Sequence, residues 1–128
     1  MSDIQRFDFR KRIHMSVVHG GTVYLTGQVG TANKPAAEQM QEILAKVEAL
    51  LAQVGSSKSR ILNTTLILAD IADYDAVNEV WDAWVDKDNA PSRSTLQAQL
   101  ASEGLLVAQI VIAAPRSGER SVSTGDTQ

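Results

Sequence analysis

The sequence predicts an α+β fold in which one mixed β-sheet carries two helices on one face, in the order β-β-α-β-α-β-β. Three observations support this prediction: short runs of β-branched and aromatic residues, two amphipathic stretches with helical spacing, and glycines or prolines between them. The chain has 128 residues, of which 44% are apolar and 21% are charged, as in an ordinary soluble globular protein. This length favours one domain, which we expect to span residues 1–114.

Two short β-prone runs, residues 16–19 and 22–28, open the predicted sheet. The second begins Thr-Val-Tyr-Leu-Thr, which is typical of a strand. Gly20 and Gly21 lie between the runs and predict a hairpin turn, because glycine tolerates the positive φ that such turns require.

Residues 35–54 form the first predicted helix. Asn33 is expected to cap its amino end, Pro35 suits the first turn, and Gly55 is a natural stop. Apolar residues at spacings of three and four give the helix one buried face. The residues of this face are Met40, Ile43, Leu44, Val47, Leu50, Leu51 and Val54.

A predicted strand at residues 61–68 follows. Its second half is apolar on both faces, which indicates a central position in the sheet. Asp70 or Asp73 is then expected to cap a second helix that runs to about residue 85. The buried stripe of this helix consists of Tyr74, Val77, Val80, Trp81 and Trp84.

Two further strands are predicted at residues 95–100 and 105–113, joined by a turn at residues 102–104. After them the chain is polar, and we expect residues 115–128 to form a disordered tail.

The predicted sheet leaves its second face uncovered, and its strands show no consistently polar side. Because a large exposed apolar surface marks an interface, we expect the chain to self-associate as a homo-oligomer. The strand residues that are too numerous to face two helices are Val17, Val23, Leu25, Leu66, Leu68, Leu106 and Ile110.

Composition excludes several classes of function. The formal charge of −3 argues against a nucleic-acid-binding protein, and no apolar run is long enough to span a membrane. Without cysteine there is no thiolate nucleophile and no zinc–sulfur site. His14 and His19 lie five residues apart across a strand and therefore cannot readily share a metal ion. We expect no metal, no cofactor and, because no signal peptide is evident, a cytoplasmic location.

Arg93 is the strongest candidate for a binding residue. It lies in the segment Ala-Pro-Ser-Arg-Ser-Thr just before a predicted strand, and Pro91 stiffens the approach. A guanidinium is always charged, and its planar fork of donors matches a carboxylate. The alternative is a solvated charge or half of a weak surface ion pair.

Other candidates are fewer. Asn78 lies on the second predicted helix, where it either contributes to a site or faces solvent. Trp81 and Trp84 fit a core role better than a pocket role because of their helical spacing. Gly27, which follows Thr26 at a strand end, either allows a ligand to approach the backbone or marks a bulge.

Several of these segments together resemble the YjgF/RidA family, the reactive-intermediate deaminases. The matching order of segments runs from about residue 13 to residue 114. The segments are Val-Tyr-Leu-Thr-Gly-Gln-Val at 23–29, Leu-Leu-Ala-Gln-Val-Gly at 50–55, Asp-Tyr-Asp-Ala-Val-Asn-Glu-Val-Trp at 73–81, Ala-Pro-Ser-Arg-Ser-Thr at 90–95 and the strand at 107–114.

The resemblance implies a chorismate-mutase-like fold, a homotrimer with clefts at its subunit interfaces, and hydrolysis of 2-imino acids or enamines to 2-oxo acids and ammonia without a cofactor. It further implies that Arg93 anchors the substrate carboxylate. Thr95, Thr26, Gly27 and Asn78 match other positions that line the same cleft.

The sequence departs from the family pattern in two places. Many deaminating members carry a glutamate in the last strand that is thought to handle the attacking water, and Ala108 occupies that position here. Gln109 is adjacent and could orient water, but it cannot act as a base, and a shift of one residue reverses its face unless a bulge intervenes. Many family members also carry an aromatic residue just before the first strand. In this sequence Ile13, beside His14, stands at about that position. The alternatives are therefore a non-catalytic binder of small carboxylate metabolites and a different chemistry in the same cleft.

Overall fold

The computed structural model describes residues 3–115, so the predicted tail lies outside the described residues except for Pro115. Six strands form one sheet in the order β1-β2-β3-β6-β4-β5. The elements are β1 (Gln5–Arg10), β2 (Ile13–His19), β3 (Thr22–Val29), α1 (Ala36–Gln53), β4 (Ile61–Leu68), α2 (Tyr74–Trp84), β5 (Ser92–Gln97) and β6 (Val107–Ala113). Only β4 and β5 pair in parallel, whereas the other neighbours are antiparallel. The predicted α+β class and mixed sheet are confirmed.

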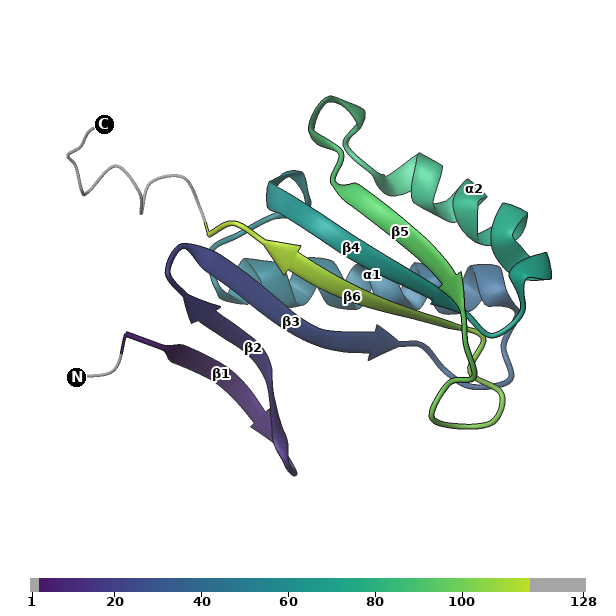
Figure 1. The fold of residues 1–128 in the computed structure, drawn as a ribbon, viewed down its shortest axis with the longest axis horizontal. Helices are drawn as coiled ribbons and strands as arrows, with labels where there is room; N and C mark the ends of the chain where they lie inside the picture. Colours follow the sequence, from purple (N-terminus) through teal and green to yellow (C-terminus); the bar gives the residue numbers. More distant parts are fainter. Residues whose placement is uncertain (1–2, 116–128) are drawn as a thin grey trace.

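The core lies between the sheet and the helices. Figure 1 shows α1 crossing behind the sheet, and α1 also packs along α2. Of the predicted α1 stripe, six residues are buried and Val54 is partly buried against the core. Val77 and Trp81 are the buried residues of α2, and the sheet contributes Val23, Leu25, Leu66 and Leu68 to the same cluster. The amphipathic spacing therefore predicted the correct faces except at Tyr74, which was expected in the buried stripe of α2 but lies in the first turn of the helix and is 38% exposed.

The sequence prediction missed β1, an edge strand that pairs only with β2. Phe7 and Phe9 alternate with charged neighbours along it, which is the pattern of a half-buried strand. Other boundaries also differ. The strands β2 and β5 each begin three residues earlier than predicted, β5 also ends three residues earlier, and β6 begins two residues later.

The turn predictions have mixed outcomes. Gly20 and Gly21 have φ values of 59° and 81°, which confirms the hairpin turn, and Gly55 has φ 77° just after α1. The Asn33 cap is wrong, because Pro35 occupies the cap position of α1 and no side chain caps it. Asn33 instead has φ 71°, and its backbone N–H donates to the Gly104 carbonyl at 2.9 Å.

Asp70 caps a short 3-10 turn (Ile71–Asp73) rather than α2, since its carboxylate accepts from the Ala72 N–H at 2.9 Å. Asp73 occupies the cap position of α2 without a side-chain hydrogen bond. Within residues 3–115 no helix combines the length and the apolar character needed to cross a bilayer.

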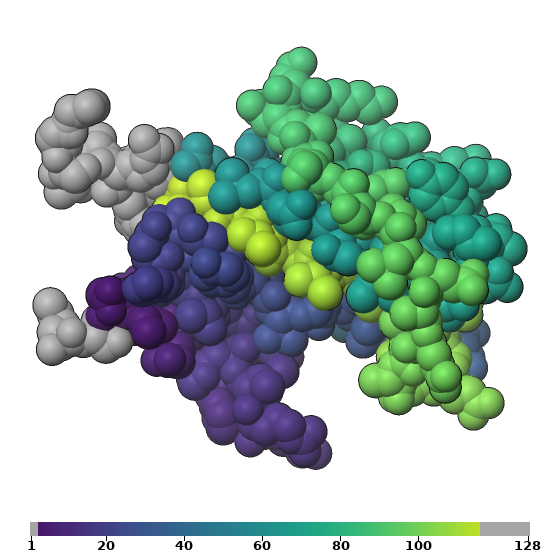
Figure 2. Space-filling model, viewed as in Figure 1, coloured from purple at the N-terminus to yellow at the C-terminus, as the bar shows by residue number. Residues whose placement is uncertain are grey.

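The face of the sheet opposite the helices is not covered by any other element of residues 3–115, and its central part is apolar, whereas Asn63, Thr65, Ser92 and Ser94 of β4 and β5 are polar. Figure 2 shows β6 open along this face between β3 and β4. The strand register puts Tyr24 beside Ile112, and Leu96 and Ala108 beside Ile67. Tyr24, Leu96 and Ile110 remain 45%, 43% and 41% exposed. This apolar face is the surface that the sequence predicted to be covered by self-association.

Candidate functional site

Arg93 lies on the edge strand β5 and points toward the helix layer. In the parallel register it is paired with Thr64, which is fully buried beneath the helices, so the two side chains share a face. Thr95 is paired with the buried Leu66 and lies on the same face of β5, two residues after Arg93. The strand therefore directs Arg93 against α2.

Three residues of α2 contact the Arg93 guanidinium. Arg93 Nη2 donates to Asn78 Oδ1 at 2.8 Å. The guanidinium carbon lies 5.4 Å from the Trp81 ring centroid and 6.0 Å from that of Tyr74, within the range of cation–π attraction. Helical spacing alone predicts that both rings belong to a core stripe, and it does not determine the direction of Asn78.

The positive charge of Arg93 is uncompensated within the described chain. A guanidinium has five N–H donors, and in residues 3–115 only one of them has a protein acceptor. Arg93 Nη1 is buried without a hydrogen-bond partner. The three ion pairs in this part of the chain lie elsewhere, so no carboxylate comes within 4.0 Å of Arg93. An anion would satisfy both the charge and the buried donor.

Thr26 and Gly27 form a bulge in β3. Leu25 pairs with Val111 and Gln28 with Gln109, which leaves Thr26 and Gly27 opposite the single residue between these partners. Thr26 Oγ1 donates to the His14 carbonyl at 2.9 Å, and the Thr26 carbonyl accepts from Gln28 Nε2 at 2.8 Å. Both bulge residues line a hollow of about 380 Å³ together with Ile13 of β2 and Lys46 of α1.

The segment after β3 is held to α1 by Glu42. Its carboxylate accepts from the Thr31 N–H at 2.7 Å and from Thr31 Oγ1 at 2.9 Å, and Lys34 Nζ lies 3.4 Å away. The bond from the Thr31 backbone, followed by that from its hydroxyl, lowers the pKa of Glu42 below its ordinary value. Gly30 lies directly against this carboxylate, since a Cβ added there would meet Glu42 Oε1 at 2.6 Å.

Ala108 and Gln109 lie on opposite faces of β6. Ala108 pairs with Ile67 and faces the uncovered side of the sheet, whereas Gln109 pairs with the buried Leu66 and faces the helices. Gln109 is 1% exposed, and its Oε1 has no hydrogen-bond partner. No bulge in β6 brings Gln109 to the face of Ala108, and the reversal expected from sequence parity is present.

The candidate residues form two separate groups in one chain. Arg93, Asn78 and Thr95 lie at the β5 edge, whereas Thr26 and Gly27 lie on β3, with β6 and β4 between them. Three strand spacings amount to about 14 Å. A small substrate could contact both groups only if a second copy of the chain brought them together.

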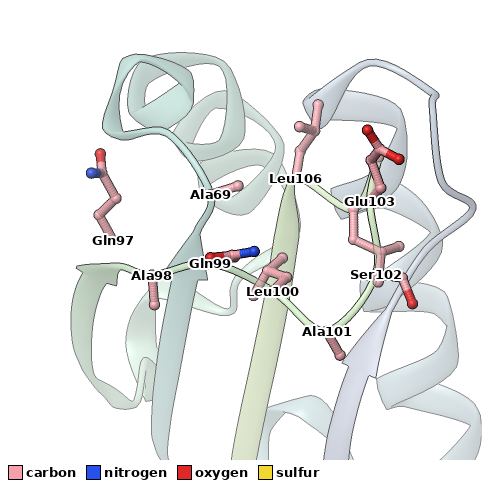
Figure 3. A pocket seen from close by; sticks show the side chains of 11 residues that line it. Ala69, Gln97, Ala98, Gln99, Leu100, Ala101, Ser102, Glu103 and Leu106 are labelled. Atoms are coloured by element: carbon pink, nitrogen blue, oxygen red, sulfur yellow. The ribbon is translucent and has the colours of Figure 1, made fainter.

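A further hollow is lined by none of the residues of either group. It measures about 660 Å³ and is formed by Ala69, Gln97 and the loop at residues 98–106 (Figure 3). The Ala98 N–H donates to the Leu68 carbonyl and the Ala69 N–H to the Leu106 carbonyl, both at 3.0 Å, so the loop is tied to the end of β4. Glu103 is the one ionisable side chain among its lining residues.

No group of three or more histidine, aspartate or glutamate side chains within residues 3–115 is arranged to hold a metal ion. Among the polar groups that meet in this part of the chain, those around Arg93 and those at the β3 bulge contain the candidate site residues. They can bind and orient a small anion, and they include no general base next to Arg93.

Comparisons with known proteins agree on one family. The family model described as Endoribonuclease L-PSP matches residues 5–114. A RutC family protein from Haemophilus ducreyi is 38% identical over 112 residues, which cover 87% of this chain and 96% of that protein. A crystal structure of a YjgF family member from Neisseria meningitidis has a TM-score of 0.87 at 35% identity and covers 90% and 97% of the two chains.

A more distant relative carries a specific activity in its name. The human 2-iminobutanoate/2-iminopropanoate deaminase is 29% identical over 90 residues, which cover 65% of each protein.

Proposed function

The chain belongs to the YjgF/RidA/RutC family, described as Endoribonuclease L-PSP, and from this premise we propose that it binds 2-imino acids and hydrolyses them to 2-oxo acids and ammonia. The observation that carries the proposal is the uncompensated guanidinium of Arg93, whose Nη1 is buried without an acceptor. A carboxylate is the ligand that this donor set fits best. The activity named for the human relative supports the same substrate class.

The proposed reaction needs little from the protein beyond positioning. Water adds to the electrophilic carbon of the C=N bond, and the resulting carbinolamine loses ammonia to leave the 2-oxo acid. Arg93 would hold the carboxylate, while backbone groups near Thr95 and Thr26 would orient the imine and the water. Holding two reactants in this geometry supplies much of the acceleration when the electrophile is already reactive.

We further propose that the site is completed in a homotrimer. The support is the separation of the Arg93 group from the Thr26–Gly27 group, together with the apolar, uncovered face of the sheet. Each cleft would then take Arg93 from one protomer and the β3 bulge from its neighbour. Light scattering should report three chains, and a stable monomer would contradict this arrangement.

One observation favours a second candidate, a non-catalytic binder of small carboxylate metabolites. Ala108 supplies no titratable group on the uncovered face, and Gln109 is turned into the helix layer, so neither residue provides a base in this chain. General acid–base assistance is worth about 10²–10⁴-fold where it is present. Binding without turnover is therefore the alternative that an experiment must separate.

The test generates 2-iminobutyrate in the assay mixture and follows the release of 2-oxobutyrate in the presence of the full chain. Wild type should accelerate release, and Arg93→Ala should lower kcat/KM by about 30–150-fold, which corresponds to about 2–3 kcal/mol for a charged hydrogen-bonded contact. Lys87→Ala removes an exposed cation six residues upstream and should leave the rate unchanged. No acceleration by wild type, combined with binding of 2-oxobutyrate, would support the binder instead.

A further inference from the structure

None of the three α2 residues that contact Arg93 carries a charge. Tyr74, Asn78 and Trp81 are spaced at i, i+4 and i+7, which puts them on one stripe of the helix. We propose that this stripe positions Arg93 without neutralising it, and that Asn78 is a positioning residue rather than a ligand of the substrate. The inference rests on the proposed role of Arg93 as the carboxylate anchor.

The helix does not lack carboxylates. Asp75, Glu79 and Asp82 lie on α2 and are exposed, and none of them pairs with Arg93. At position 78, where an aspartate would have nearly the same shape, the chain has an amide. An aspartate there would form an ion pair with Arg93 at the 2.8 Å distance that Asn78 Oδ1 now occupies.

The hydrogen-bonding geometry leaves part of the guanidinium without a protein acceptor. Asn78 Oδ1 accepts one hydrogen from Nη2, and the two aromatic rings attract the cation without consuming an N–H donor. The orientation of the side chain is thereby fixed, while Nη1 keeps both of its donors and the charge is retained in full. A binding site for an anion needs both properties, because a mobile arginine loses entropy on binding and a paired arginine must first release its partner.

The inference predicts that stability and ligand affinity change in different ways in two variants of Asn78. Asn78→Asp should hold Arg93 more firmly and should therefore raise the melting temperature, yet it should weaken binding of 2-oxobutyrate at pH 7 about tenfold or more, because the new carboxylate competes with the ligand. Asn78→Ala should lower the melting temperature and weaken binding only about threefold, because the charge remains free. A purely structural role for Asn78 would instead make affinity follow stability across the two variants.

Direct contact between Asn78 and the substrate is tested in a second background. With Arg93→Lys in place, Asn78→Ala should change the affinity for 2-oxobutyrate less than twofold, because Asn78 acts through the guanidinium. A further loss equal to that in wild type would overturn the positioning role. Equal affinity of Asn78→Asp and wild type would overturn the claim that the charge must stay uncompensated.

Thermal unfolding of the ligand-free variants tests this inference independently of the proposed function. If wild type bound neither 2-oxobutyrate nor pyruvate, the proposed substrate class would be wrong. The stability measurements would still test the contact on which the inference depends, since Asn78→Asp must unfold at a higher temperature than Asn78→Ala and must lose that advantage when Arg93 is replaced by alanine. Absence of this coupling would overturn the inference whatever the ligand.

Discussion

A glutamate can be introduced at two adjacent positions of β6, Gln109 and Ala108, which lie on opposite faces of the sheet. Gln109 is 1% exposed and lies against the core with its Oε1 unpaired, so Gln109→Glu would bury a carboxylate for which residues 3–115 provide no partner cation. An uncompensated buried charge costs about 3–5 kcal/mol. With a urea m-value of about 2 kcal/mol/M, the unfolding midpoint should fall by about 2 M.

The penalty should depend on pH in a definite direction. Burial raises the pKa of the introduced carboxyl in the folded state above its value in the unfolded chain. Below the unfolded pKa the group is protonated in both states and the penalty is absent, and the penalty grows as the pH rises above that value. The variant should therefore lose more stability relative to wild type at pH 8 than at pH 5.

Ala108→Glu is the matched control. Its side chain would leave β6 on the uncovered face of the sheet, away from the core beneath the helices, so Ala108→Glu should destabilise the fold less than Gln109→Glu does. It also restores the acid that the family resemblance puts at this position, and we expect turnover of 2-iminobutyrate to rise about tenfold or more. Equal destabilisation by both variants, or a penalty at Gln109 that is independent of pH, would refute the assigned faces.

Three further predictions concern the loop and the sheet. Glu42→Gln should reduce stability at pH 7, and the difference from wild type should disappear as the pH falls through the lowered pKa of Glu42, which urea unfolding at a series of pH values would reveal. Gly30→Ala should lower the melting temperature, because its Cβ would lie 2.9 Å from the Gln39 carbonyl oxygen as well as against Glu42; an unchanged melting temperature would show that the loop can shift freely. Ile110→Asp puts a charge on the uncovered apolar face and should yield smaller particles in light scattering, whereas an unchanged mass would exclude this face as the interface.

Much of the fold could be predicted because each element carries a local periodicity. The α1 stripe from Met40 to Leu51 predicted the buried face correctly, and the β-branched run at 61–68 predicted a strand with neighbours on both sides. The β1 strand was missed although Phe7 and Phe9 alternate with charges, because the run is short and strongly charged. The Asn33 cap failed because a tertiary bond to Gly104 determines its backbone conformation.

The candidate site was less predictable because it depends on contacts between distant elements. That Arg93 could bind an anion followed from its residue type, but its bond to Asn78 depends on the side of β5 that faces α2. The ring contacts of Tyr74 and Trp81 could not be separated from a core role by helical spacing alone. The position of Gln109 was predictable, because the alternation of strand residues determines it once Ala108 is placed.

A crystal structure of the full chain with 2-oxobutyrate tests the central claim most directly. The account predicts that the ligand carboxylate lies within hydrogen-bond distance of the Arg93 guanidinium while the Asn78 Oδ1–Arg93 Nη2 bond persists. Ligand bound in the hollow formed by residues 97–106, with the surroundings of Arg93 unchanged, would contradict it.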